Sequence, residues 1–121
     1  YNANPDSFNA AIDVLMAAVG EKDMVAGEMR ELGDETESSH RAVGEYAAKH
    51  GVPLLLGLGK DCAAMIDAYL KAGGEKGVLY SDRTALEADC VALASADTVF
   101  LVKGSRGATM ETVVAALSSE T

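Results

Sequence analysis

Short hydrophobic runs alternate with longer stretches of helical spacing along the whole of this chain. The clearest strand is the nearly continuous apolar run VPLLLGLG at residues 52–59, which is typical of a strand covered on both faces. Strands that alternate with helices predict an α/β fold, with a mostly parallel sheet between two layers of helices. The expected helices span residues 8–19, 38–50, 60–74, 82–95 and 108–119, and the expected strands span 23–28, 52–59, 77–80 and 97–105.

Small polar residues mark the expected starts of these helices. Asp6 or Ser7 is predicted to cap the first helix, Ser38 the second, and Ser81 or Asp82 the fourth, because their side chains accept hydrogen bonds from backbone N–H groups of the first turn. The 121 residues predict one domain, covering residues 1–121, that is large enough to bury a core.

The segment YNANP, residues 1–5, stands directly before the first expected helix. The alternating order lacks a strand ahead of that helix, so we expect that the chain was cut from a longer protein just before Tyr1. YNANP would then be a strand-to-helix turn at the edge of the sheet where ligands bind in open α/β folds. Tyr1, Asn2 and Asn4 are candidate ligand contacts, and a turn with a helix cap is the simpler alternative.

Two acidic residues follow the first expected strand within AGEMRELG, residues 26–33. Glu28 and Glu31 would lie at the carboxyl edge of the sheet, where they could contact a cation, a ribose or an amine. A solvated loop is the alternative.

The third segment on this edge is LVKGSRG, residues 101–107, in which an apolar strand runs into polar residues and then a helix. Lys103, Ser105 and Arg106 would place two cations and a hydroxyl near a helix N-terminus, which suits an anion, and Arg106 could hold a carboxylate with two hydrogen bonds. Surface cations near a cap are the alternative. The chain contains neither a P-loop motif nor the Gly-x-Gly-x-x-Gly fingerprint.

The net charge of −9 makes the chain a poor generic partner for nucleic acid or anionic membranes. No apolar run is long enough to span a bilayer. Cys62 and Cys90 are interpreted as separate buried thiols of a cytoplasmic protein, with a disulfide as the alternative. His40 and His50 are ten residues apart on one expected helix, so we do not expect a paired site, and His40 is interpreted as structural.

Three segments together resemble the C-terminal domain of the bacterial Mur ligases: YNANPDS, GEMRELGDETESSHRAVGEYAAKHG and LVKGSRGATMETVVAAL. They occur in the family's order and extend over essentially the whole chain. The resemblance implies a Rossmann-like fold and a three-domain enzyme, of which the other domains hold a UDP-sugar and carry the P-loop. It is strongest to the member that adds D-alanyl-D-alanine to UDP-N-acetylmuramoyl-tripeptide. That reaction uses ATP and magnesium, and the amine of the dipeptide attacks an acyl phosphate.

The resemblance also implies roles for individual residues. The YNANP turn would meet the nucleotide or a neighbouring domain, and the Lys-Gly-Ser-Arg segment would hold the dipeptide and its carboxylate. Glu28 stands where the family usually has aspartate. We expect no catalytic residue and no metal ligand within this domain, and no activity from the isolated chain. The implied contacts are Tyr1, Asn2 and Asn4 for nucleotide or interdomain binding, and Lys103, Ser105, Arg106, Glu28 and Glu31 for substrate.

Two other hypotheses stay open. The chain could be a free-standing module that binds a nucleotide or a small anion, although it lacks a glycine fingerprint. It could also be the same domain of a Mur ligase that takes another amino component.

Overall fold

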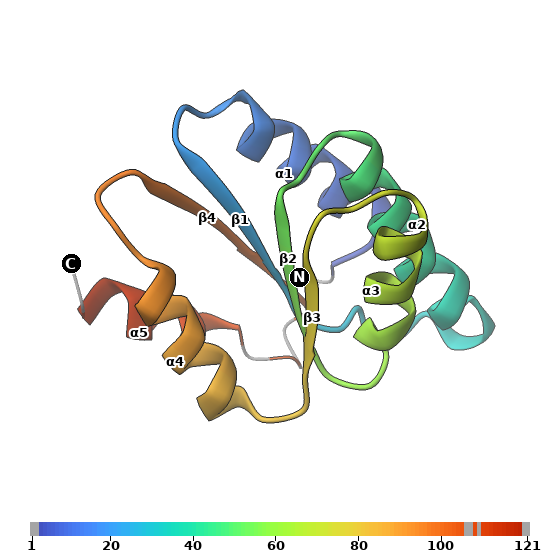
Figure 1. Cartoon of the computed structure of the whole chain (residues 1–121). Helices are drawn as coiled ribbons and strands as arrows, with labels where there is room; N and C mark the ends of the chain where they lie inside the picture. Colours follow the sequence, from blue (N-terminus) through green and yellow to red (C-terminus); the bar gives the residue numbers. More distant parts are fainter. Residues whose placement is uncertain (1–2, 106–107, 109, 120–121) are drawn as a thin grey trace.

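A four-stranded parallel sheet forms the middle layer of the computed structural model, which describes residues 3–105, 108 and 110–119. The strand order is β3-β2-β1-β4. Helices α1, α2 and α3 lie on one face of the sheet, and α4 and α5 lie on the other (Figure 1). The elements in chain order are α1 (Pro5–Ala17), β1 (Glu21–Ala26), η1 (Gly33–Glu35), α2 (Thr36–Lys49), β2 (Leu54–Leu58), α3 (Cys62–Lys71), β3 (Gly77–Tyr80), α4 (Arg83–Leu93), β4 (Thr98–Lys103) and α5 (Glu111–Ser119). The predicted three-layer α/β fold is therefore confirmed.

The two faces of the sheet carry separate hydrophobic clusters. Met24 of β1 packs with Phe8, Ile12 and Met65 beneath α1–α3. The next residue of the strand, Val25, points to the opposite face and packs beneath α4 and α5. Strands β1 and β2 are largely buried, as expected for strands that are covered on both sides.

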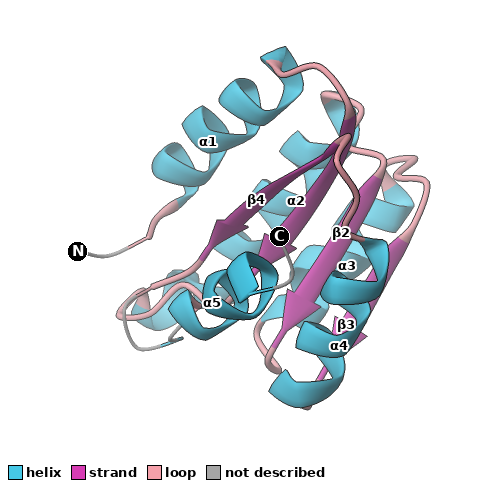
Figure 2. Ribbon diagram, turned by 90° about the vertical axis from the view of Figure 1, so that its left-hand side faces the viewer, coloured by secondary structure: helices cyan, strands magenta, loops and turns pink. Residues whose placement is uncertain are grey.

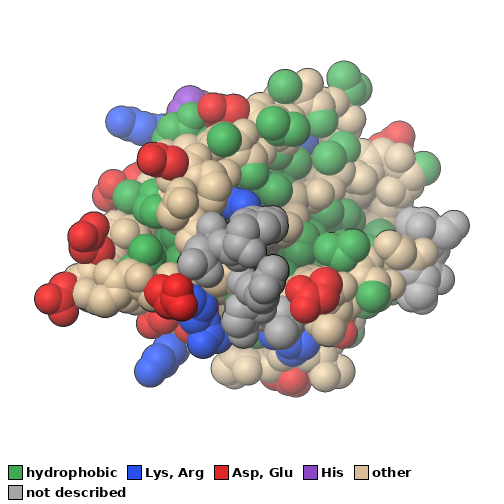
Figure 3. Space-filling model, turned by 180° about the vertical axis from the view of Figure 1, so that it is seen from behind, with side chains coloured by type: hydrophobic (Ala, Val, Ile, Leu, Met, Phe, Trp, Pro, Cys, Tyr) green, Lys and Arg blue, Asp and Glu red, His purple; other side chains and the backbone are tan. Residues whose placement is uncertain are grey.

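Strand β4 pairs with β1 along its whole length, from Glu21 opposite Thr98 to Ala26 opposite Lys103. Every residue of β4 is only partly buried, because among the described residues no strand pairs with its other side. Figure 2 shows β4 at this margin of the sheet. In the view from behind, hydrophobic side chains gather in the middle and upper part of the surface, with acidic side chains spread around them (Figure 3).

Helices α2 and α3 approach each other closely at Gly44 of α2, which is buried. A Cβ atom built on Gly44 would lie 2.1 Å from the carbonyl oxygen of Met65 and 3.0 Å from the amide nitrogen of Tyr69. The absence of a Cβ atom on Gly44 is therefore what allows the two helix backbones to meet.

Two of the predicted helix caps are wrong. Asn4 caps α1, and its Oδ1 accepts a hydrogen bond from the Ser7 N–H at 2.8 Å. The Ser7 hydroxyl in turn accepts from the Asn4 N–H at 3.1 Å, which completes a capping box, and Pro5 fills the first turn.

Helix α2 begins at Thr36, ahead of Ser38, because the 3-10 turn η1 leads directly into it. Asp82 caps α4, one of the two predicted alternatives.

Both cysteines are free and buried, as predicted. Burial raises the pKa of the Cys62 thiol to about 12, assisted by the nearby charge of Glu28. Burial raises the pKa of Cys90 to about 11, assisted by Asp89. The reactive thiolate is therefore scarce at neutral pH in the folded chain.

We expect neither thiol of the folded chain to react with a disulfide reagent at pH 8 within minutes. Raised thiol pKa values lower the thiolate fraction at this pH, and burial blocks access. In denaturant both thiols should react at once. The absorbance of the thiol released from the reagent measures the reaction rate in the folded and in the denatured chain. A folded chain that reacts as fast as free cysteine would contradict the burial of these two thiols.

None of the helices in the described part of the chain is long and apolar enough to cross a membrane.

Candidate functional site at the carboxyl edge of the sheet

Two loops meet where β1 and β4 end, and backbone hydrogen bonds join them. The Gly27 N–H donates to the Lys103 carbonyl at 2.8 Å, and the Ser105 N–H donates to the Glu28 carbonyl at 3.0 Å. Residues 27–33 and the start of the Lys-Gly-Ser-Arg segment are thus neighbours, as the sequence predicts for loops that follow adjacent parallel strands.

Two glycines make this junction possible. A Cβ atom on Gly104 would lie 3.0 Å from the Cα of Gly27 and 2.9 Å from the Met110 side chain. A Cβ atom on Gly27 would lie 2.6 Å from the sulfur of Met110. The two backbones touch over the Met110 side chain, so side chains are excluded from both positions.

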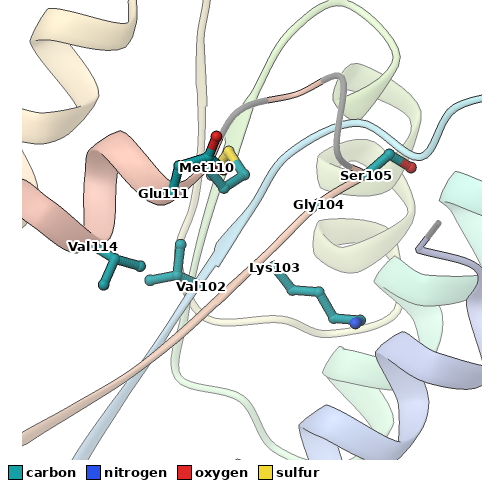
Figure 4. Close-up of a pocket in the computed structure, with 7 residues that line it drawn as sticks. All are labelled: Val102, Lys103, Gly104, Ser105, Met110, Glu111 and Val114. Carbon is teal, nitrogen blue, oxygen red and sulfur yellow. The ribbon is translucent and has the colours of Figure 1, made fainter. Parts of the chain in front are cut away.

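Lys103 directs its side chain away from the cavity that its backbone lines. The cavity has a volume of about 280 Å³ and lies between the end of β4 and α5, bordered by Val102, Gly104, Met110, Glu111 and Val114. Figure 4 shows the Lys103 side chain pointing to the other side of the strand, toward α1. There its ammonium lies 5.8 Å from the centre of the Phe8 ring. Lys103 therefore brings a positive charge to the first part of α1, over Phe8.

Ser105 is buried, with 1% of its surface exposed. Its hydroxyl oxygen accepts a hydrogen bond from the Arg30 N–H at 2.8 Å. The Ser105 carbonyl also accepts from the Ala108 N–H at 2.8 Å. In this structure Ser105 fastens the loop after β1 to the loop after β4.

His40 of α2 holds the same loop from the other side and is fully buried. The Met29 N–H donates to Nε2 of His40 at 3.1 Å, so Nε2 carries no proton. The Nδ1 atom lies 2.6 Å from the Thr36 carbonyl oxygen and donates to it. Both ring nitrogens of a neutral imidazole are thereby used, which agrees with the structural role predicted for His40.

Glu28 reaches from the end of β1 to the start of α3. Its Oε2 accepts a hydrogen bond from the Asp61 N–H at 2.9 Å, and its Oε1 accepts from Nη2 of Arg30 at 3.2 Å. The carboxyl group fills the space beside Gly59, where a Cβ atom would lie 2.6 Å from Cδ of Glu28. A negative charge at a helix N-terminus is favourable. The side chain of Asp61, the N-cap residue of α3, makes no capping hydrogen bond, and the Glu28 carboxylate accepts from the Asp61 N–H instead.

The remaining predicted site residues have different positions. Asn4 is exposed at the start of α1, where its side-chain oxygen serves the helix cap. Glu31 is exposed on the loop after β1. Tyr1, Asn2 and Arg106 lie outside the described residues.

Sequence reasoning missed the anchoring roles of His40 and Asp61 at this edge. Both hydrogen bonds join residues that are far apart in the sequence: the His40 ring accepts from the Met29 N–H, and the Asp61 N–H donates to Glu28. No local motif signals either contact. Among the residues that the structure describes, no group of three or more His, Cys, Asp or Glu side chains could hold a metal ion.

The family model described as "Mur ligase, glutamate ligase domain" matches residues 1–106 of the chain.

The chain belongs to the Mur ligase family.

Known relatives of this Mur ligase domain include two named UDP-N-acetylmuramoyl-tripeptide–D-alanyl-D-alanine ligases. The Escherichia coli protein is 42% identical over 119 residues, which cover 97% of this chain and 25% of that protein. The Bacillus subtilis protein is 32% identical over 117 residues, which cover 94% and 26%. The chain thus spans about a quarter of the length of these relatives.

Solved structures show the same fold. A crystal structure of MurF from Acinetobacter baumannii has a TM-score of 0.81 at 30% identity, covering 98% of this Mur ligase domain and 26% of that chain. A MurF ligase from Thermotoga maritima in complex with ADP has a TM-score of 0.81 at 24% identity, covering 99% and 27%.

Proposed function

We propose that this chain is the C-terminal domain of a three-domain, ATP-dependent ligase that joins D-alanyl-D-alanine to UDP-N-acetylmuramoyl-tripeptide in peptidoglycan precursor synthesis. The observation that carries the proposal is the 42% identity to the Escherichia coli ligase of that name across 97% of this chain. The enzyme would work in the cytoplasm. The use of ATP is supported by the Thermotoga maritima enzyme, whose structure was solved in complex with ADP. ATP and Mg²⁺ would bind chiefly to the other domains, and the isolated chain would not catalyse ligation.

The domain would hold the incoming dipeptide and close over the nucleotide. Holding the amine beside an acyl phosphate makes its attack effectively intramolecular, and closure keeps water from an intermediate that it would hydrolyse. Lys103 and Arg106 would attract the carboxylate of the dipeptide, while Ser105 would keep their loop in place. Tyr1, Asn2 and Asn4 would contact the nucleotide or the neighbouring domain.

We expect Lys103→Met in the intact ligase to lower kcat/KM for the dipeptide roughly tenfold to a hundredfold, the usual loss when a charged hydrogen bond is removed. The KM for ATP should change little. Steady-state phosphate release measures both values when the dipeptide and ATP are varied in turn. Lys76→Met provides an exposed lysine control at the opposite end of the sheet.

Three outcomes would contradict the proposal. Ligation by the isolated chain would show that no other domain is needed. A wild-type ligase that takes another amino component and rejects D-alanyl-D-alanine would assign a different member of the family. An unchanged kcat/KM in Lys103→Met would remove Lys103 from the dipeptide site.

A further inference from the structure

We propose that the open edge of β4 binds a fifth, parallel strand, which is formed by the residues that directly precede Tyr1 in the intact ligase. The inference rests on the proposed function only in that the chain continues ahead of Tyr1. It assigns an occupant to the edge of the sheet that carries Lys103.

The backbone of β4 can form hydrogen bonds on the side that faces away from β1. The Lys103 carbonyl accepts from the Gly27 N–H at 2.8 Å, so the backbone groups of Lys103 face β1. Successive residues of a strand direct these groups to alternate sides, so Leu101 also faces β1 while Phe100 and Val102 face outward. Among the residues that the structure describes, no strand pairs with this outward side.

The side chains of β4 are apolar on both faces of the sheet, and both faces stay partly exposed at this edge. Val99 and Leu101 pack at the margin of the cluster beneath α1–α3, and Phe100 and Val102 pack at the margin of the cluster beneath α4 and α5. A cavity of about 480 Å³ borders Phe100, Val102 and Val114 of α5. A strand with apolar side chains on both faces would extend both clusters.

Strand β4 lacks the features that protect a free edge. It has six residues, its sequence TVFLVK contains no proline, and its single charged residue is the last one. Strand β3, at the other edge, has four residues and begins with glycine. Natural sheets protect free edges with short strands, charges or proline. Strand β4 is therefore typical of an internal strand, and β3 is typical of a true edge.

The handedness of the crossover connections favours the edge of β4 over that of β3. The connection from β1 through α2 to β2 moves toward β3 across the face that also carries α1 (Figure 1). A strand outside β4 that reaches β1 through α1 moves in the same direction across the same face, so it has the same hand. A strand outside β3 would have to cross this face in the reverse direction, which gives the left-handed connection that parallel strands avoid.

The start of the described chain fixes the direction of this strand. Ala3 is buried, with 1% of its surface exposed, and Asn4 has an extended backbone. The first part of α1 lies over the carboxyl end of β4, where the Lys103 ammonium is 5.8 Å from the centre of the Phe8 ring (Figure 2). A strand that leads into α1 would therefore end at the same edge of the sheet as β4, and it would run parallel to β4.

The fifth strand would place the candidate site inside the sheet rather than at its margin. Strand β4 would become internal, and its Lys-Gly-Ser-Arg segment would lie between the loop after β1 and the YNANP turn. Ligands of open α/β folds bind at this carboxyl edge. We expect the segment ahead of Tyr1 to match the six residues of β4 in length and to be apolar on both faces, without proline.

Hydrogen exchange of single amides in the intact wild-type ligase tests the proposal. The amides of Phe100 and Val102 should exchange about a hundredfold or more slowly than the amide of Leu79, because a paired strand amide exchanges only when the sheet opens. Leu79 is the matched control on β3. The Tyr80 carbonyl accepts from the Gly59 N–H at 3.0 Å, which turns the backbone groups of Leu79 away from β2.

Nuclear Overhauser effects from the Val102 amide identify the occupant in the same sample. They should reach the residues directly ahead of Tyr1 at every protein concentration. Fast exchange at Phe100 and Val102 would overturn the proposal, and so would slow exchange at Leu79 alone. Contacts from Val102 to another domain, or protection that is lost on dilution, would also overturn it, since dilution would reveal a second copy on this edge.

These outcomes leave the proposed function standing, because that function is tested by the ligation of D-alanyl-D-alanine with the wild-type enzyme. An enzyme that rejects this dipeptide would overturn the proposed function, while the exchange and contact measurements would still decide the place of the fifth strand.

Discussion

Gly44→Ala should lower the free energy of unfolding of this chain by about 1–3 kcal/mol, a large share of the stability of a small domain. The new methyl carbon would lie 2.1 Å from the Met65 carbonyl oxygen, well inside any real contact. The obstacle is backbone rather than a flexible side chain. Helices α2 and α3 must therefore move apart, which opens the cluster that contains Val43 and Met65.

A competing effect works in the other direction. Alanine is favoured over glycine inside a helix by about 1 kcal/mol. The steric effect should win, because helix separation disturbs many buried contacts at once. Urea unfolding followed by circular dichroism measures the difference. Ala42→Gly, at an exposed position of the same helix, isolates the propensity effect. If Gly44→Ala proved more stable than wild type, the close approach of α2 and α3 would be wrong.

His40→Leu should lower the free energy of unfolding by about 1–3 kcal/mol, because it leaves the buried Met29 N–H without its acceptor. Leucine is similar in size to histidine, so the loss reports mainly on hydrogen bonding. The effect should also be local. Amide hydrogen exchange should accelerate at Met29 and Arg30 beyond the change seen in α3, because the loop after β1 loses one of its anchors.

The chain supplies its own control for this experiment. His50 is exposed at the end of α2, where the centre of its ring lies 4.0 Å from the centre of the Tyr46 ring. His50→Leu should change the free energy of unfolding by no more than about 0.5 kcal/mol. His40→Gln should restore part of the loss, since its amide oxygen can accept from the Met29 N–H. Equal effects of His40→Leu and His50→Leu would rule out an anchoring role for His40.

The order of helices and strands could be predicted from the sequence because each element carries its own pattern. The apolar run around Leu55 and Leu56 has no polar position, which identifies a strand buried on both faces. The first residues of the helices and strands were harder to predict. Strand β1 begins at Glu21, ahead of its apolar part, because pairing with β4 rather than hydrophobicity sets where it starts. Asn4 caps α1 because Pro5 begins the helix earlier than the hydrophobic spacing suggests.

The edge that holds the candidate site was predictable for a similar reason. Loops that follow adjacent parallel strands must emerge together, and this places Glu28 beside Ser105. What those residues do there was not predictable. The contact between Glu28 and Asp61 joins two loops 33 positions apart. The left-handed turn at Glu31 falls on a residue type that gives no local signal for it.

The position of β4 in the sheet has a consequence for the order of assembly during synthesis. Strand β1 pairs with β2 soon after it in the chain, but its other neighbour begins only at Thr98. A nascent chain can therefore form the β1–β2–β3 side early, while β1 keeps one bare edge until the last strand leaves the ribosome. Ser105 comes later still, so the loop that carries Glu31 gains its final anchor at the end of folding. Truncated or stalled chains would expose the unpaired edge of β1, and they would lack the assembled candidate site even where most of the sheet had formed.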